Sequence, residues 1–168
     1  MDSRFVFVLT IVVNLLSYSL IALWYVVPWL ATKPRYSALL PLIFVNTFRT
    51  VGLTFIVPQV TDPRLPAAFA FPAAYGDLLA VGLAFLAIFA LRARMRFALP
   101  LVWVFNLEGT ADLLYALVQG GLLQFPTFQV GAAWFIPTFY VTLLLVVHIL
   151  IFWVLLRPQP SAHPSPTY

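Results

Sequence analysis

Four charged residues lie inside long apolar stretches of this chain: Arg49, Asp77, Glu108 and Asp112. A carboxyl group in apolar surroundings can donate, accept or relay a proton, and a guanidinium group can hold a carboxylate or another anion. Titratable groups inside a membrane are typical of proton relays and solute-binding sites. We therefore treat these four residues as the first candidates for function.

The spacing of these residues predicts how they share helical faces. Glu108 and Asp112 are four residues apart and stack on one face, which Tyr115 and Gln119 continue.

A second polar stripe is predicted around the arginine. In an α-helix, Asn46, Arg49 and Thr50 would lie on one face turned inward. Asp77 belongs to a stripe of small residues that permits close helix approach, formed by Ala73, Ala80, Ala84 and Ala87.

If three acids beside one arginine were all ionised, the cluster would carry two net negative charges in apolar surroundings, which is unfavourable. Burial and like charge both favour the neutral form of a carboxyl group. We expect Arg49 to pair with one carboxylate, that of Asp112 or of Asp77. At least one of the other acids should be protonated near neutral pH.

Other polar residues of the apolar stretches extend the candidate set. Asn46 and Asn106 can bond between helices, and His148 can contact a proton or ligand. A rise of about 1.5 Å per residue predicts that the four charged residues lie in one layer, from the midplane to the outer half of the membrane. The same rise places His148 about 21 Å from the outer end of its helix, below this charged layer. The candidate ligand- or proton-binding residues are Arg49, Asp77, Glu108, Asp112, Asn46, Asn106 and His148, and the catalytic candidates are Glu108 and Asp112.

Several kinds of chemistry are excluded by what the sequence lacks. The chain has no cysteine, so it has no disulfide and no thiolate metal site. His148 is the only histidine in the apolar stretches, and no phosphate loop or dinucleotide fingerprint occurs. We expect neither a metal nor a cofactor.

The composition then identifies the class of protein. Of the 168 residues, 63% are apolar and 8% are charged, and the mean hydropathy is +1.01. Soluble domains carry about 25% charged residues, so a soluble enzyme, a disordered chain and a DNA-binding domain are excluded. We predict an integral membrane protein in a lipid bilayer, with no nucleic-acid partner.

Five segments have the length of about 20 apolar residues that a hydrocarbon core of ~30 Å requires. They cover about 5–31, 37–60, 70–91, 98–122 and 133–156. Since the bilayer offers backbone groups no water, each must be helical. The prediction is an all-α bundle over 1–157, followed by a disordered tail, 158–168, rich in Pro and Ser.

The distribution of charge orients the bundle. Six cations and no acid fall on one side of it: Lys33, Arg35, Arg92, Arg94, Arg96 and Arg157. The positive-inside rule makes that side cytoplasmic, so the N-terminus is outside and the C-terminus inside. The excess of Arg over Lys, with abundant Ala, Leu and Pro, points to a GC-rich genome and a bacterial inner membrane.

These features support three hypotheses of function. The first is binding or transport of a small solute or protons in a polar chamber between the second, third and fourth spans; five spans are few for a transporter, so an oligomer is expected. The second is a membrane enzyme that uses acid–base chemistry on a lipophilic, isoprenoid or sterol-like substrate. The third is a non-catalytic subunit of a larger membrane complex.

The cavity around the charged residues would discriminate between these hypotheses. A polar chamber open to one face favours transport. A closed apolar pocket touching Glu108 and Asp112 favours the enzyme, and a filled bundle with every charge paired favours the subunit.

Overall fold

The computed structural model describes residues 2–58 and 60–158, and within these ranges all the regular structure is helical, with no strand. Five of its helical elements are long and apolar enough to cross a membrane: Ser3–Ala31, Arg35–Ile56, Ala67–Arg92, Ala98–Leu122 and Gly131–Leu156. The predicted all-α architecture with five such helices is confirmed. Residues 159–168 of the predicted tail lie outside the described residues.

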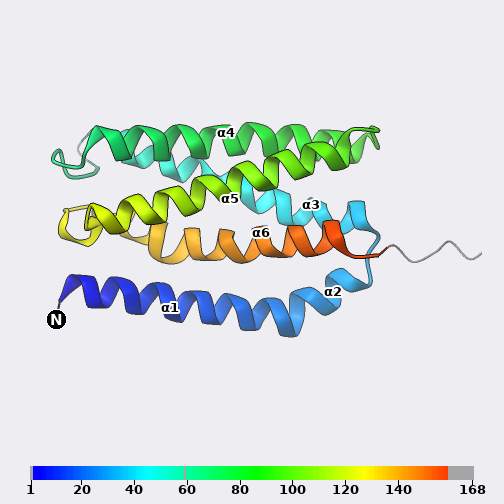
Figure 1. Cartoon of the computed structure of the whole chain (residues 1–168), viewed down its shortest axis with the longest axis horizontal. Coiled ribbons are helices and arrows are strands. Elements are labelled where there is room, and N and C mark those ends of the chain that lie inside the picture. The colour runs from blue at the N-terminus through cyan, green and yellow to red at the C-terminus, as the bar shows by residue number, and fades with distance from the viewer. Residues whose placement is uncertain (1, 59, 159–168) are drawn as a thin grey trace, which may run out of the picture.

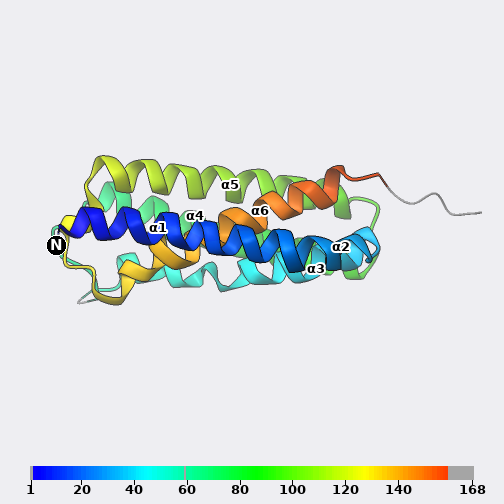
Figure 2. The same cartoon turned by 90° about the horizontal axis from the view of Figure 1, so that it is seen from below.

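The five elements lie side by side as rods, and the chain reverses direction at each end of the bundle (Figures 1 and 2). Several rods combine more than one kind of helix. In chain order the main segments are α1 (Ser3–Ile21), α2 (Val27–Ala31), α3 (Arg35–Val45), α4 (Ala67–Arg92), α5 (Ala98–Leu122) and α6 (Val141–Leu156). Short connections join the rods; the last of them contains a turn of 3-10 helix at Phe125–Thr127 (η3), and another such turn, Gly131–Trp134 (η4), begins the fifth rod.

Two π-helical turns widen the rods beside prolines. The turn η1, Ala22–Val26, ends two residues before Pro28, and the turn η5, Ile136–Tyr140, contains Pro137. Proline has no N–H to bond four residues back, and its ring crowds the carbonyl there, so the local ladder must change. The prolines therefore account for both departures from α geometry.

A 3-10 helix of eleven residues, η2 (Asn46–Ile56), continues α3. Runs of 3-10 helix beyond three or four residues are uncommon and often mark strained or functional segments. With three residues per turn, the buried positions of η2 recur every third residue: Asn46, Arg49, Gly52 and Phe55. The prediction that Thr50 shares this stripe is wrong: Thr50 is exposed, because the fourth residue leaves the face of a 3-10 helix.

The second rod also ends earlier than predicted, at Ile56 instead of near residue 60. Pro58 disfavours helical backbone at the residue before it, and Val57 accordingly adopts an extended conformation. The third rod begins earlier than predicted, at Ala67 directly after Pro66, instead of near residue 70.

The apolar core is divided into two clusters. One surrounds residues such as Leu39, Ile88 and Ile151 and lies toward the end of the bundle that carries the C-terminus. The other contains Phe55, Phe69 and other side chains near the opposite end. Between the two clusters lie buried polar side chains from η2, α5 and α6, among them Arg49, Asn106 and His148.

The α1 rod is the most loosely held, packing mainly against α6 and η5 (Figure 2). Few of its residues are buried. The Asn14 side-chain amide donates a hydrogen bond to the Thr138 carbonyl at 2.8 Å, within the π-helical turn η5. A carbonyl in this irregular turn thus gives α1 one specific polar contact.

Asp62 joins two of the connections at the end of the bundle that carries the N-terminus. Its carboxylate accepts from the Arg64 guanidinium at 2.7 Å and from the backbone N–H of Gln129 at 3.0 Å. The Arg64 side chain, with the backbone N–H groups of Gln129 and Arg64, holds the pKa of the Asp62 carboxyl well below its usual range.

We predict that replacing Asp62 by Asn lowers the thermal stability of the protein at neutral pH. A carboxyl whose folded pKa is depressed contributes stability above its unfolded value of about 3.9 and loses it as the pH falls through the folded value. The difference in melting temperature between the wild type and Asp62→Asn should therefore be constant above pH 5 and shrink below about pH 4. Unfolding in detergent micelles, followed by tryptophan fluorescence between pH 3 and pH 7, measures it; a difference that grows on acidification would contradict the prediction.

Candidate functional site

Arg49 is completely buried, and its guanidinium group bonds to two helices at once. The Nε donates to Asp77 Oδ1 of α4 at 2.6 Å, and Nη2 donates to Asp112 Oδ2 of α5. The Nη1 donates to the Gly109 carbonyl at 3.3 Å. The sequence predicted a single carboxylate partner; Arg49 instead bridges both aspartates, because α4 packs closely against both η2 and α5.

The close approach depends on glycines placed opposite the carboxylates. A Cβ on Gly52 of η2 would overlap the Asp77 carboxylate, and a Cβ on Gly76 of α4 would overlap the Asp112 carboxylate. Each aspartate therefore occupies the space that a side chain of the neighbouring helix would fill. Gly52 lies one 3-10 turn after Arg49, so the period of η2 presents the cation and the gap on the same face.

A third glycine, Gly109 of α5, brings His148 into the site. A Cβ on Gly109 would lie 2.9 Å from His148 Nε2 and 3.0 Å from Arg49 Nη1. The prediction that His148 lies below the charged layer is therefore wrong. That estimate assumed straight helices of uniform rise, whereas 3-10 and π turns precede α6, and α5 is inclined to α6 (Figure 1).

Asn106 fixes the orientation of the His148 ring. The Asn106 amide donates to the His148 carbonyl at 3.2 Å, which directs its Oδ1 to His148 Nδ1 at 2.6 Å. Since Oδ1 can only accept, Nδ1 carries the hydrogen, and Nε2 of the neutral ring is left as an acceptor. The buried Nε2 has no hydrogen-bond partner among the described residues.

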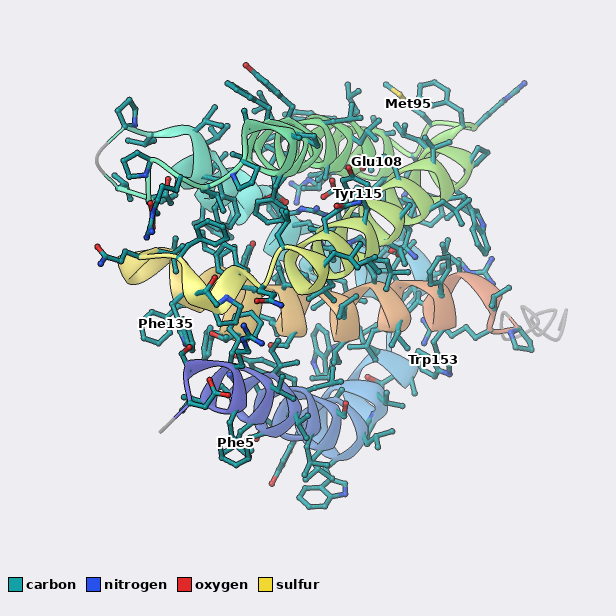
Figure 3. All side chains as sticks on the ribbon, turned by 60° about the vertical axis from the view of Figure 1, so that its left-hand side comes forward. Phe5, Met95, Glu108, Tyr115, Phe135 and Trp153 are labelled. Carbon is teal, nitrogen blue, oxygen red and sulfur yellow. The ribbon has the colours of Figure 1, made fainter. Side chains whose placement is uncertain are left out.

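Two further predicted residues retain unpartnered atoms. Asn46 is fully buried and donates to the Leu42 carbonyl of its own rod at 3.1 Å, but its Oδ1 has no partner among the described residues. Glu108 lies on the side of α5 that faces α4 (Figure 3), and its Oε2 is buried and likewise unpartnered within the described part of the chain. The structure thus brings Arg49, Asp77 and Asp112 into direct contact, whereas Glu108 makes no hydrogen bond to Arg49.

Tyr140 is a further residue of this site, and its place in the sequence relative to the charged residues does not single it out. Its hydroxyl group donates to the Val45 carbonyl at 2.8 Å, at the junction of α3 and η2. A tyrosine within a long apolar stretch usually needs a partner for its hydroxyl group, and this signal could have identified it. Tyr140 ties the π turn before α6 to the start of the 3-10 segment that carries Arg49.

An apolar pocket of about 240 Å³ extends from the aspartates toward the end of the bundle that carries the N-terminus. Among its lining residues only Asp77 and Asp112 are charged; Glu108 does not line it. The walls come from all five rods and include four phenylalanines, Phe7, Phe55, Phe69 and Phe125. The pocket therefore differs from the polar chamber expected between three spans.

Each of the two aspartates that line this pocket keeps one carboxylate oxygen that Arg49 does not bind. Asp77 uses Oδ1 and Asp112 uses Oδ2 for Arg49, and each side chain is 13% exposed. The second oxygens, Asp77 Oδ2 and Asp112 Oδ1, accept no side-chain or backbone hydrogen bond from a described residue, and they are the atoms nearest the Cβ positions of Gly52 and Gly76. In the same ranges no group of three His, Cys, Asp or Glu residues is arranged to hold a metal ion.

We predict that Gly52→Ala and Gly76→Ala each destabilise the protein strongly. The added methyl group must displace a carboxylate from Arg49, and disrupting a buried ion pair typically costs about 3–5 kcal/mol. Gly82→Ala on α4 is the matched control, because a Cβ there meets nothing within 4 Å; it should be neutral or stabilising by up to about 1 kcal/mol. Denaturation with sodium dodecyl sulfate in mixed micelles gives the free energies of unfolding. Equal effects at positions 52, 76 and 82 would show that the glycines have no special role.

Comparison with known proteins identifies a family but no activity. No curated protein and no solved structure matches the chain. One family model, described as a domain of unknown function (DUF8737), matches residues 6–156. This range includes every residue of the Arg49 site, and the chain therefore belongs to the family of that domain of unknown function, DUF8737.

Proposed function

We propose that the chain is an integral membrane protein whose five apolar rods cross a bilayer, with the N-terminus outside and the C-terminus in the cytoplasm. The end of the bundle near the C-terminus carries six cations and, among the described residues, no acid. At the opposite end, Arg4 and Arg64 are offset by Asp2 and Asp62. The positive-inside rule supports this orientation, and the composition favours a bacterial inner membrane.

Within that membrane, the function we propose is the binding of a small, mostly apolar molecule whose polar head donates hydrogen bonds. A cationic head should bind more tightly than a neutral one. The observation that carries the proposal is the apolar pocket, whose only charged lining residues, Asp77 and Asp112, are partly exposed and each keep one carboxylate oxygen that accepts no hydrogen bond from a described residue. Ligand pockets typically combine apolar walls with a few convergent polar groups. Here the polar groups are acceptors, so the complementary head is a donor.

The charge of the site favours a cation over an anion. Arg49 already donates to both aspartates and to the Gly109 carbonyl, so its charge is neutralised within the site. With both aspartates ionised, Arg49 and its partners carry one net negative charge. The phenylalanine walls add aromatic faces, which attract cations and pack well against apolar groups.

The same geometry separates this proposal from its alternatives. Of the two catalytic candidates, Glu108 does not line the pocket, so an acid–base enzyme would have to use Asp112, which lines it but is already bound to Arg49. A purely structural subunit needs a filled site, and this one is hollow. Transport would require the ligand or a proton to pass the Arg49 layer, and the buried acceptors at Glu108 and His148 are the groups available for that step.

The proposed topology predicts where introduced cysteines react. The chain has no cysteine, so single replacements have no background. Thr127→Cys, between α5 and α6, should react with a membrane-impermeant maleimide on intact cells. Met95→Cys, between α4 and α5, should react only after the membrane is made permeable. The reverse pattern would contradict the orientation, and labelling of both sites on intact cells would contradict insertion across the membrane.

The proposed ligand class predicts a ranking of eight-carbon probes. In nanodiscs of neutral lipid, octylamine should bind more tightly than octanol, and octanol more tightly than octanoate. A charge-assisted hydrogen bond contributes about 1.5–3 kcal/mol, so the amine should bind at least about tenfold more tightly than the carboxylate. The concentration dependence of the melting temperature measures binding.

Two variants localise this binding to the pocket. Ala116→Leu fills the pocket without touching Arg49 and should abolish the shift caused by octylamine, whereas Ala111→Leu, on the exposed face of α5, should not. Asp112→Asn should reduce the preference for octylamine over octanol. Equal binding by wild type and Ala116→Leu, or tighter binding of octanoate than of octylamine, would overturn the proposal.

A further inference from the structure

A second pocket lies at the opposite end of the bundle, well away from the aspartates. It has a volume of about 430 Å³ and is formed where α2, the α2–α3 connection and the end of α6 meet. Its lining includes Thr32, Lys33, Pro34, Trp153 and Arg157. It shares no residue with the pocket at Asp77 and Asp112.

Arg157 is held in place at this pocket by backbone groups. Its Nη1 donates to the Leu30 carbonyl at 2.7 Å and its Nη2 to the Lys33 carbonyl at 2.6 Å. The guanidinium group also lies over the Trp153 ring, 5.4 Å from the ring centroid. None of these partners carries a negative charge, so the charge of Arg157 is fixed in position but not neutralised.

Two more cations lie beside Arg157 without an acidic partner. The Lys33 ammonium lies over the Trp29 ring, 5.5 Å from the centroid, and makes no hydrogen bond to a described residue. Arg35 donates to the Arg157 carbonyl, and its Nε is buried with no hydrogen-bond partner in the described ranges. Three cations thus converge where two tryptophans flank the end of the bundle.

We infer that this pocket binds the phosphate group of an anionic phospholipid. A phosphate accepts several charge-assisted hydrogen bonds, and arginine and lysine are its usual partners. Basic pockets between helices at the cytoplasmic face are typical binding sites for acidic lipid headgroups. The inference rests on the membrane orientation proposed above, which places this end at the cytoplasmic surface.

The surroundings of the pocket favour a lipid over a free phosphate. The exposed surface of the first rod near the pocket, along η1 and α2, is apolar and aromatic and includes Leu23, Trp24, Tyr25 and Trp29. A lipid whose phosphate occupies the pocket could lay its acyl chains along this face, whereas inorganic phosphate would gain nothing from it. Tryptophan and tyrosine in this position are also typical of the membrane interface.

The test compares lipids on the intact, full-length protein in neutral detergent micelles. Native mass spectrometry counts bound phosphatidylglycerol against phosphatidylcholine with the same acyl chains, with and without added inorganic phosphate. We expect retention of phosphatidylglycerol in preference to phosphatidylcholine. Lys33→Gln should weaken phosphatidylglycerol binding about fivefold, since one cation near a lipid surface contributes about 1 kcal/mol.

The controls separate a site from a general basic surface. Lys33→Arg should retain the binding, and Arg96→Gln, an exposed cation at the same end but outside the pocket, should change it less than twofold. Lys33 is chosen over Arg157 because Arg157 also satisfies backbone carbonyls on which folding depends.

Each contrary result overturns the inference in a distinct way. An equal loss with Arg96→Gln and Lys33→Gln would mean that only the overall charge attracts the lipid. Complete displacement of the lipid by inorganic phosphate would assign the pocket to a free anion. The cysteine-labelling experiment reports separately on orientation, so a wrong topology is distinguishable from a missing lipid site.

Discussion

The buried guanidinium of Arg49 is the constraint on which the rest of the bundle depends. An isolated buried cation costs several kcal/mol, and only excellent geometry repays that cost. Here the geometry comes from carboxylates on α4 and α5 and a carbonyl on α5. Three helical elements must therefore meet around one side chain, and their separations are set by it.

Three glycines and the 3-10 geometry of η2 allow η2, α4 and α5 to pack around Arg49. Gly52 and Gly76 leave room for the two carboxylates, and Gly109 leaves room for Arg49 and His148. The 3-10 geometry of η2 places Arg49 and Gly52 on the same face, one turn apart. In an α-helix these two positions would lie 60° off a common line, because 3.6 residues make a turn. The long 3-10 segment is thus consistent with the requirements of the ion pairs.

The ion-paired layer also divides the bundle into two chemically different halves. On one side of it, apolar and aromatic residues leave a pocket whose deep end is acidic. On the other side, an apolar core leads to an end where all the charged residues, among those described, are basic. The two proposed sites, one for a lipophilic donor within the bilayer and one for an acidic headgroup at its surface, therefore lie in different halves and share no lining residue.

The sequence by itself determined the helical class, the number of long apolar helices and the four charged residues inside them, because burying charge in apolar segments is rare and costly. It also indicated that Arg49 needs carboxylate partners. Only the tertiary structure decided that both aspartates bind Arg49, that His148 lies beside Arg49 at Gly109, and that Glu108 makes no hydrogen bond to Arg49. Those outcomes depend on 3-10 and π turns and on helix inclination, which shift residues by a fraction of a turn. Periodicity along one strictly α-helical chain cannot anticipate such shifts, because they arise where several helices fit together.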